Sequence, residues 1–275
     1  MTQKIAFQGA HGAYSEEACK SARPNMATMA CNNFENMLAA VRDNHAELAM
    51  VPIENSTYGR VADIHRLLPE SGLYIVDEAY TRVRISLMVN AGVHLSEIKY
   101  AKAHTVLLPQ ARKFLRDHNI TPINAVDSAG AAAELAAKPD HETCVLASAL
   151  AAKTYGLEIL SRDIEDHDHN TTRFVIMSKK PNFERRGDGK MKTSFIFEVR
   201  NIPASLYKAM GGFATNGVNM IKLESYMIGG SFSATQFYAD VEGHPEDEGV
   251  KNALDELAYF SSRIKVLGVY PSAQT

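Results

Sequence analysis

The segment 170–178 carries a hydroxyl, a guanidinium and an aromatic ring, on Thr172, Arg173 and Phe174, where an apolar, β-branched run begins. Such a run predicts a buried strand, and the polar residues 166–171 before it predict a loop. A rigid strand beside an accessible loop is a common location for catalytic side chains. The alternative is an ordinary strand start, in which Thr172 packs and Arg173 lies at the rim.

A second polar cluster follows a strand predicted at 47–51. Residues 54–57 are four consecutive side chains that form hydrogen bonds, Glu-Asn-Ser-Thr, and a helix is predicted at 61–68. In open α/β sheets, ligands bind beyond the carboxyl ends of the strands. The cluster therefore predicts part of a binding site. The alternative is a helix cap, although a cap needs only one side chain.

Two further segments place hydrogen-bonding groups at strand ends. A glycine-containing turn at 9–14 follows a strand predicted at 4–8, and Ser15 is expected to cap the next helix. The backbone N–H groups of this turn are then available to an anion. Gln110 lies at the start of a helix predicted at 109–117, which has proline in its first turn. For His104, just before it, we expect a capping or rim role, with contact to a ligand as the alternative.

Composition narrows the class of protein. The chain has 275 residues, of which 45% are hydrophobic and 22% charged, as in ordinary globular proteins. A net charge of −3 disfavours a nucleic-acid-binding protein. We find no secretory signal and no run of about 18 apolar residues, and expect a cytoplasmic protein with no membrane contact. The cysteines Cys19, Cys31 and Cys144 have no metal-binding spacing, which indicates free thiols in a reducing compartment.

The run 166–169, Asp-His-Asp-His, has the side chains of a metal site. Adjacent ligands on one loop give poor coordination geometry unless distant residues complete the site. No metal site is therefore predicted.

Strands and helices alternate over residues 1–180, which predicts an α/β domain with largely parallel sheets. We expect one lobe at about 1–80 and 165–180, a second lobe at about 81–164, and a ligand cleft between them. The polar segment 181–192 predicts a linker. Residues 193–275 follow a βαββαβ pattern, typical of a ferredoxin-like domain, with one strand at 233–241.

Together these segments resemble the prephenate dehydratase family over nearly the whole chain. The resemblance is carried by residues 9–16, 52–56, Gln110 and 170–174, and by 206–209 and 219–225, which resemble the family's C-terminal ACT domain. It implies a catalytic domain of two lobes, like a type II periplasmic binding protein, followed by a regulatory domain. The implied enzyme is a lyase of phenylalanine biosynthesis that converts prephenate to phenylpyruvate with loss of carbon dioxide and water.

The resemblance also implies roles for individual residues. Thr172 is expected to be catalytic, as a donor to the departing hydroxyl, and Arg173 to grip a substrate carboxylate. Phe174 is expected either to wall the substrate ring or to lie in the core. The full set expected to contact substrate is Glu54, Asn55, Ser56, Gln110, Asn170, Arg173, Phe174, Gly12, Ala13 and Ser15. The reaction requires no metal and no organic cofactor.

For the C-terminal domain, the resemblance implies phenylalanine as an allosteric effector and a homodimer or homotetramer. The residues expected to contact it are Ala204, Ser205, Leu206, Asn219, Leu223, Glu224 and Ser225. Ala204 replaces a glycine common in the family, and Tyr226-Met227 replaces Arg-Pro, which leaves the strength and sign of regulation open. Two alternative functions remain, arogenate dehydratase and a non-catalytic sensor on the same scaffold.

Overall fold

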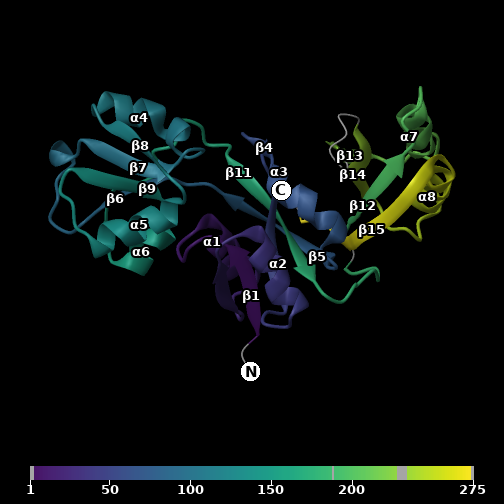
Figure 1. Cartoon of the computed structure of the whole chain (residues 1–275), viewed down its shortest axis with the longest axis horizontal. Helices are drawn as coiled ribbons and strands as arrows, with labels where there is room; N and C mark the ends of the chain where they lie inside the picture. The colour runs from purple at the N-terminus through teal and green to yellow at the C-terminus, as the bar shows by residue number, and fades with distance from the viewer. Residues whose placement is uncertain (1–2, 188, 228–233, 274–275) are drawn as a thin grey trace. The chain divides into compact units, whose positions relative to one another are not determined.

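The computed structural model describes residues 3–187, 189–227 and 234–273 (Figure 1). Asp188 of the predicted linker and Ser233 of a predicted strand lie outside these ranges. The chain divides into two compact units. The first unit is Met1–Ile64 with Ala79–Phe174, and the second is His65–Glu78 with Val175–Thr275. The structure therefore has a mixed α/β fold.

The first unit contains two groups of strands. In the first group, β1 (Lys4–Gln8) pairs in parallel with β2 (Ala27–Cys31) and β3 (Leu48–Asn55), and β11 (Thr171–Ser178) follows β3 in the strand order. The two-residue strand β4 (Gly59–Arg60) runs antiparallel to the end of β3. Helices α1 (Tyr14–Ala22) and α2 (Phe34–Arg42) connect the parallel strands. The sequence did not predict β2, whose residues Ala-Thr-Met-Ala-Cys include only one β-branched side chain.

The second group is a five-stranded sheet in the order β10-β6-β9-β7-β8. Its strands are β6 (Ser86–Val89), β7 (Tyr100–His104), β8 (Thr121–Ala125), β9 (Thr143–Ala147) and β10 (Glu158–Ser161). Strand β7 is parallel to β8 and β9, whereas β6 is antiparallel to β9 and β10. This sheet is therefore mixed, because β6, through which the chain enters it, runs against the direction of the other four strands.

Helices cover both faces of this sheet, and each face has its own core. Figure 1 shows α4 on one side and α5 and α6 on the other. The elements are η2 (Leu95–Glu97), η3 (Leu108–Ala111), α4 (Arg112–Asp117), α5 (Ser128–Ala137) and α6 (Ala149–Tyr155). The helix predicted at 109–117 thus begins as a 3₁₀ turn. Gly156 ends α6 in a left-handed conformation.

The second unit has the predicted βαββαβ order. Its elements are β12 (Met191–Val199), α7 (Ser205–Thr215), β13 (Met220–Met227), β14 (Ala234–Glu242), α8 (Glu248–Phe260) and β15 (Ser261–Pro271). The strands are antiparallel in the order β13-β14-β12-β15. Buried phenylalanines of β12, α7 and β14 pack with Leu257 of α8 in one core. Within this unit, β15 also pairs with β5 (Tyr74–Arg82) at Gly268 and Ile75, after η1 (Leu68–Glu70).

Three elements cross the division between the two units. Helix α3 (Ala62–Leu67) and strands β5 and β11 each include residues of both units. Among the described residues, no helix has the length and apolar character needed to cross a bilayer.

Candidate active site

A cavity of about 420 Å³ lies in the first unit, where the ends of β1, β3 and β7 meet the start of α1, α5 and β11. This volume is typical of small-molecule sites. Of the residues predicted to contact substrate, those that line it are Gly12, Ala13, Ser15, Asn55, Gln110, Asn170 and Thr172. The structure therefore brings together residues that are as much as 160 positions apart, Gly12 and Thr172 (172 − 12 = 160).

Asn55 has a fixed orientation at the end of β3. Its side-chain oxygen accepts the backbone N–H groups of Thr57 and Tyr58, at 2.9 and 3.0 Å. The amide nitrogen must then face the other way, where it donates to Asn170 Oδ1 at 2.5 Å and to Thr172 Oγ1 at 3.0 Å. The turn after β3 therefore decides which atom of Asn55 meets Thr172.

The hydrogen bonds continue beyond Asn170. Its amide nitrogen donates to Gln110 Oε1, and Gln110 Nε2 donates to the carbonyl oxygen of Val106 at 2.8 Å. We call Asn55, Asn170 and Gln110 the amide relay. Every bond in the relay has a defined direction, set at one end by backbone N–H groups and at the other by a backbone carbonyl. Because Thr172 Oγ1 accepts from the relay, its own hydroxyl hydrogen is left for a partner in the cavity.

Glu54 and Arg173 form an ion pair instead of lining the cavity. Arg173 Nη1 lies 2.8 Å from Glu54 Oε1, and the Arg173 side chain is only 6% exposed. Neighbouring residues of a strand point to opposite faces. Asn55 and Thr172 therefore meet on one face of the β3–β11 pair and Glu54 and Arg173 on the other. The prediction that both ionic side chains contact substrate is not supported by this geometry.

Ser56 and Phe174 also lie outside the cavity lining. The Ser56 hydroxyl donates to the His169 carbonyl at 2.8 Å and accepts the Thr171 N–H at 2.9 Å, which fixes the loop before β11 to the end of β3. Phe174 is 1% exposed and belongs to the core. Of the two roles that the sequence left open for Phe174, the structure favours the core role.

The turn before α1 differs from the prediction. The helix starts at Tyr14 with Ala13 at its N-cap, and Ser15 lies inside the first turn and caps nothing. Glu16 reaches back and accepts the Gly12 N–H at 2.6 Å, while the Ala13 N–H donates to Ala10. Two of the backbone donors predicted for a substrate anion are therefore already used within the protein.

Glu16 is a buried carboxylate with several hydrogen-bond donors around it. Burial by itself would raise its pKa, but the Gly12 N–H, Lys20, Thr28 and His11 outweigh burial and lower the pKa to about 2. A carboxylate held in this way stabilises the turn that carries Gly12 to the cavity.

Gly12, in the turn before α1, also lies directly against α6. Its φ is +89°, and a Cβ on it would lie 2.5 Å from Cα of Ala151 in α6. Its carbonyl accepts the Ser148 hydroxyl at 2.6 Å. Only glycine fits both the backbone angle and the space.

Several lining residues were not predicted. Arg60 is the only lysine or arginine among the described residues of the cavity lining, and Tyr58 precedes it in the same turn. His104, Ser128 and Ser148 also line the cavity. Arg60 lies on the two-residue strand β4, which is too short for any periodicity to show. The available signal was its position just after the polar cluster at 54–57.

The acidic side chains of the loop 166–169 contact neighbouring groups of the protein. Asp166 accepts the backbone N–H of Lys113 at 3.1 Å, and Asp168 lies 3.0 Å from His169. Within the described ranges, no group of three or more His, Cys, Asp or Glu side chains is arranged to hold a metal ion.

The residues predicted to bind an effector lie around the start of α7 and on β13. Ala204 has φ 62°, in the left-handed region that favours glycine. Leu223 and Ser225 point to an exposed side of β13, and Glu224 points to the other, 3.2 Å from Lys222 Nζ. Asn219 is exposed and its carbonyl accepts from Glu242. Ser205 and Leu206 are half-buried.

Comparisons with known proteins agree with this arrangement. The prephenate dehydratase family profile matches residues 5–182. A bifunctional N-acyl-homoserine lactone acylase/prephenate dehydratase of Komagataeibacter europaeus is 50% identical, over 98% of this chain and 96% of the relative. Arogenate dehydratase/prephenate dehydratase 2 of Arabidopsis thaliana is 34% identical, over 98% of this chain and 72% of the relative.

A solved structure is also similar throughout. The prephenate dehydratase of Arthrobacter aurescens, in complex with L-Phe, has a TM-score of 0.89 and 27% identity, and the match covers 98% of this chain and 90% of that one. The cavity geometry, the family profile and these similarities lead to one conclusion: the chain belongs to the prephenate dehydratase family.

Proposed function

We propose that this chain is a prephenate dehydratase, which converts prephenate to phenylpyruvate, carbon dioxide and water. The observation that carries the proposal is the amide relay, which leaves the Thr172 hydroxyl as a hydrogen-bond donor in the cavity.

The substrate supplies most of the driving force. As its tertiary carboxylate leaves as carbon dioxide, the bonding electrons move into the ring and expel the hydroxyl group on the opposite carbon, and the ring becomes aromatic. Thr172 donates a hydrogen bond to that departing oxygen, which leaves as hydroxide and takes a proton from solvent to become water. An alcohol is a poor proton source at neutral pH, so its main contribution is stabilisation of developing negative charge. The relay pre-orients this donor.

Arg60 is our candidate partner for a substrate carboxylate. Prephenate is a dianion, and an arginine binds a carboxylate with two parallel hydrogen bonds. Among the described residues, Arg60 is the cationic side chain of the cavity lining, and it stands opposite Glu54 in the β3–β4 register. We assign Glu54 and Arg173 a positioning role, because their ion pair joins β3 to β11 and so holds Asn55 beside Thr172.

The function is tested by adding prephenate to the purified protein and following phenylpyruvate by its ultraviolet absorbance. Arogenate is the matched second substrate, because it differs only by an amino group in place of the keto group. A kcat/KM for prephenate well above that for arogenate supports the proposal. The reverse ratio assigns the chain to arogenate dehydratase, and binding without turnover of either substrate assigns it to a non-catalytic sensor.

A second candidate activity is hydrolysis of N-acyl-homoserine lactones. It is favoured by one observation, the 50% identity, over 98% of this chain, to a relative named for both activities. Release of homoserine lactone from an N-acyl-homoserine lactone by the purified protein tests it. The Thr172→Val variant shows whether the two activities share the cavity, since only a shared site would lose both.

For regulation, we propose residues 1–180 as the catalytic domain, 181–192 as the linker and 193–275 as an ACT domain that binds phenylalanine in a homodimer or homotetramer. The βαββαβ order and the similarity to a dehydratase solved with L-Phe support this division. Phenylalanine is expected to lower dehydratase activity. Activity measured at increasing phenylalanine concentration, with sedimentation at each point, tests both the effect and the assembly.

A further inference from the structure

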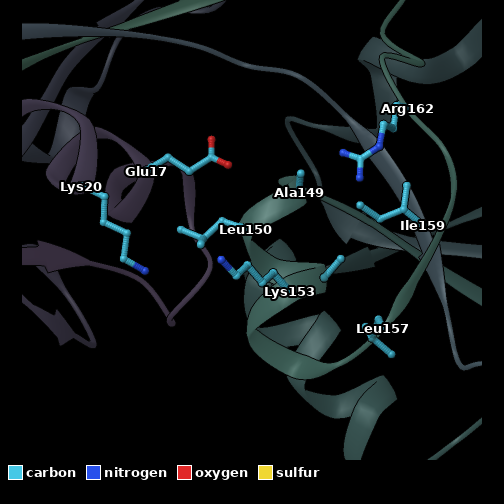
Figure 2. A pocket seen from close by; sticks show the side chains of 9 residues that line it. Glu17, Lys20, Ala149, Leu150, Lys153, Leu157, Ile159 and Arg162 are labelled. Atoms are coloured by element: carbon cyan, nitrogen blue, oxygen red, sulfur yellow. The ribbon is translucent and has the colours of Figure 1, made fainter. Parts of the chain in front are cut away.

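A second cavity, of about 680 Å³, lies in the first unit between α1 and the segment formed by α6 and β10 (Figure 2). None of the residues that line it lines the candidate active site. Its volume is in the range of small-molecule sites. The roles proposed above for catalysis and regulation make no use of it.

Three cationic side chains surround this cavity, Lys20 of α1, Lys153 of α6 and Arg162 just after β10. Figure 2 shows the ammonium ends of Lys20 and Lys153 extending toward one another, with the Arg162 guanidinium beyond Leu150 and Ala149. Lys20 is paired with Glu16 at 3.0 Å. In the part of the chain that the structure describes, Lys153 and Arg162 have no carboxylate partner. Two cations without a partner therefore face one cavity, which favours an anion between them.

Glu17 is the acidic side chain of the lining, and its hydrogen-bond partners belong to the protein itself. Its carboxyl is hydrogen-bonded to the backbone N–H of Leu150 and to the Ser148 side chain at the start of α6. Burial raises the pKa of Glu17 and so favours its neutral form.

The rest of the lining is apolar. Leu150, Leu157 and Ile159 line it together with two alanines of α6, and Figure 2 shows these side chains among the cations. A small inorganic anion would bind to the cations and leave this apolar surface exposed to water. A ligand with both a charged head and an apolar body would use both kinds of surface.

We propose that this cavity is a binding site for an amphipathic organic anion, whose carboxylate is attracted by the cations Lys153 and Arg162 and whose apolar body lies against Leu150, Leu157 and Ile159. A carboxylate forms charge-assisted hydrogen bonds with a guanidinium or with an ammonium group. The apolar body contributes according to its length, since each methylene that becomes fully buried strengthens binding roughly fourfold.

Octanoate is the probe, and calorimetric titration of the full chain is the measurement. We expect one octanoate per chain. Lys153→Met keeps the apolar stem of the lysine, and Arg162→Gln keeps hydrogen-bonding capacity, so both variants should remain folded, which thermal melting checks. Each is expected to weaken octanoate binding roughly fivefold, and the double variant roughly 25-fold. The control is Lys113→Met, because Lys113 is an exposed lysine of α4 that lines neither cavity and should leave binding unchanged.

Other probes separate the alternatives. Butyrate is expected to bind at least tenfold more weakly than octanoate if most of the added methylenes are buried. The proposal is overturned if inorganic phosphate competes as well as octanoate, or if wild-type protein binds no octanoate at about 10 mM. It is also overturned if the double variant binds as wild type does, or if Arg60→Gln abolishes binding, which would place octanoate in the candidate active site.

Discussion

Replacing Asn55 with aspartate should reverse the direction of the relay without changing the shape of the side chain. One oxygen of the new carboxylate still accepts the N–H groups of Thr57 and Tyr58. The other oxygen replaces the amide nitrogen that donates to Asn170 Oδ1 and Thr172 Oγ1. Two acceptors cannot bond to each other, so the Thr172 hydroxyl turns and donates to the carboxylate. The substrate then loses its donor.

The size of the effect follows from two contributions. Removing a single donor to a developing oxyanion lowers kcat by about 10²–10³, or about 2.7–4 kcal/mol. The added negative charge also repels a dianionic substrate. At a separation of about 6–8 Å and an effective dielectric constant of about 20, each like-charge pair costs roughly 2–3 kcal/mol, which should raise KM.

The assay is phenylpyruvate formation, with kcat and KM measured separately for Asn55→Asp. The control is Asn33→Asp, which adds the same charge at the N-cap of α2, where the Asn33 side chain accepts the Asn36 N–H at 2.7 Å and aspartate caps equally well. The control should retain wild-type kinetics. If Asn55→Asp keeps kcat within about threefold of wild type while remaining folded, the relay does not orient the catalytic donor.

Three other substitutions test separate parts of the account. Arg60→Gln should raise KM about 10- to 100-fold with a smaller change in kcat, because a charged hydrogen bond to the substrate is lost; an unchanged KM would remove Arg60 from the site. Ala204→Gly should raise the free energy of unfolding in urea by up to about 1 kcal/mol, because alanine at φ 62° costs about 1–2 kcal/mol and the added freedom of unfolded glycine offsets part of it; a loss of stability would contradict the strain. The pKa of Glu16 is lowered from 4.5 to about 2, so its contribution is complete above pH 4.5 and is lost as the pH falls toward 2. Urea unfolding between pH 5 and pH 2 should therefore show a loss on the order of 3 kcal/mol in wild type that is absent in Glu16→Gln, and equal pH dependence would contradict this role.

The sequence predicted much of the fold because its strands and helices are strongly patterned. The parallel strands of the first unit and the βαββαβ order of the second follow from local periodicity and from glycine at turns. Strand β2 was missed because its side chains are small and only partly buried. The second sheet is mixed because pairing direction depends on where strands enter the sheet, which no local pattern records.

The structure brings part of the predicted site together in one cavity, and the placement of the other residues follows from strand geometry. Thr172, Asn170, Asn55 and Gln110 line the cavity, since polar residues at strand ends meet there. Arg173 was grouped with Thr172 because the two are adjacent in sequence, yet alternation along a strand turns them to opposite faces. Arg60 was not predicted because the strand that carries it, β4, has only two residues and shows no periodicity in the sequence.

The turn at 9–16 shows a second kind of limit. Its glycines and its position after β1 predicted a cavity-lining turn, and Gly12 and Ala13 do line the cavity. Whether the Gly12 N–H is available to a substrate depends on Glu16, because the Glu16 side chain turns back and accepts that N–H. Such a reversal is decided by packing around α1 and could not be inferred from residue type alone.

The central claim is that the Thr172 hydroxyl, aimed by the relay, stabilises the departing oxygen. The most direct measurement is kcat for prephenate in Thr172→Val, which removes the hydroxyl and keeps the shape, beside Thr172→Ser, which keeps the hydroxyl. The account predicts a fall of about 10²–10³ in the valine variant and most of the activity in the serine variant. A valine variant that turns over prephenate at the wild-type rate would contradict it.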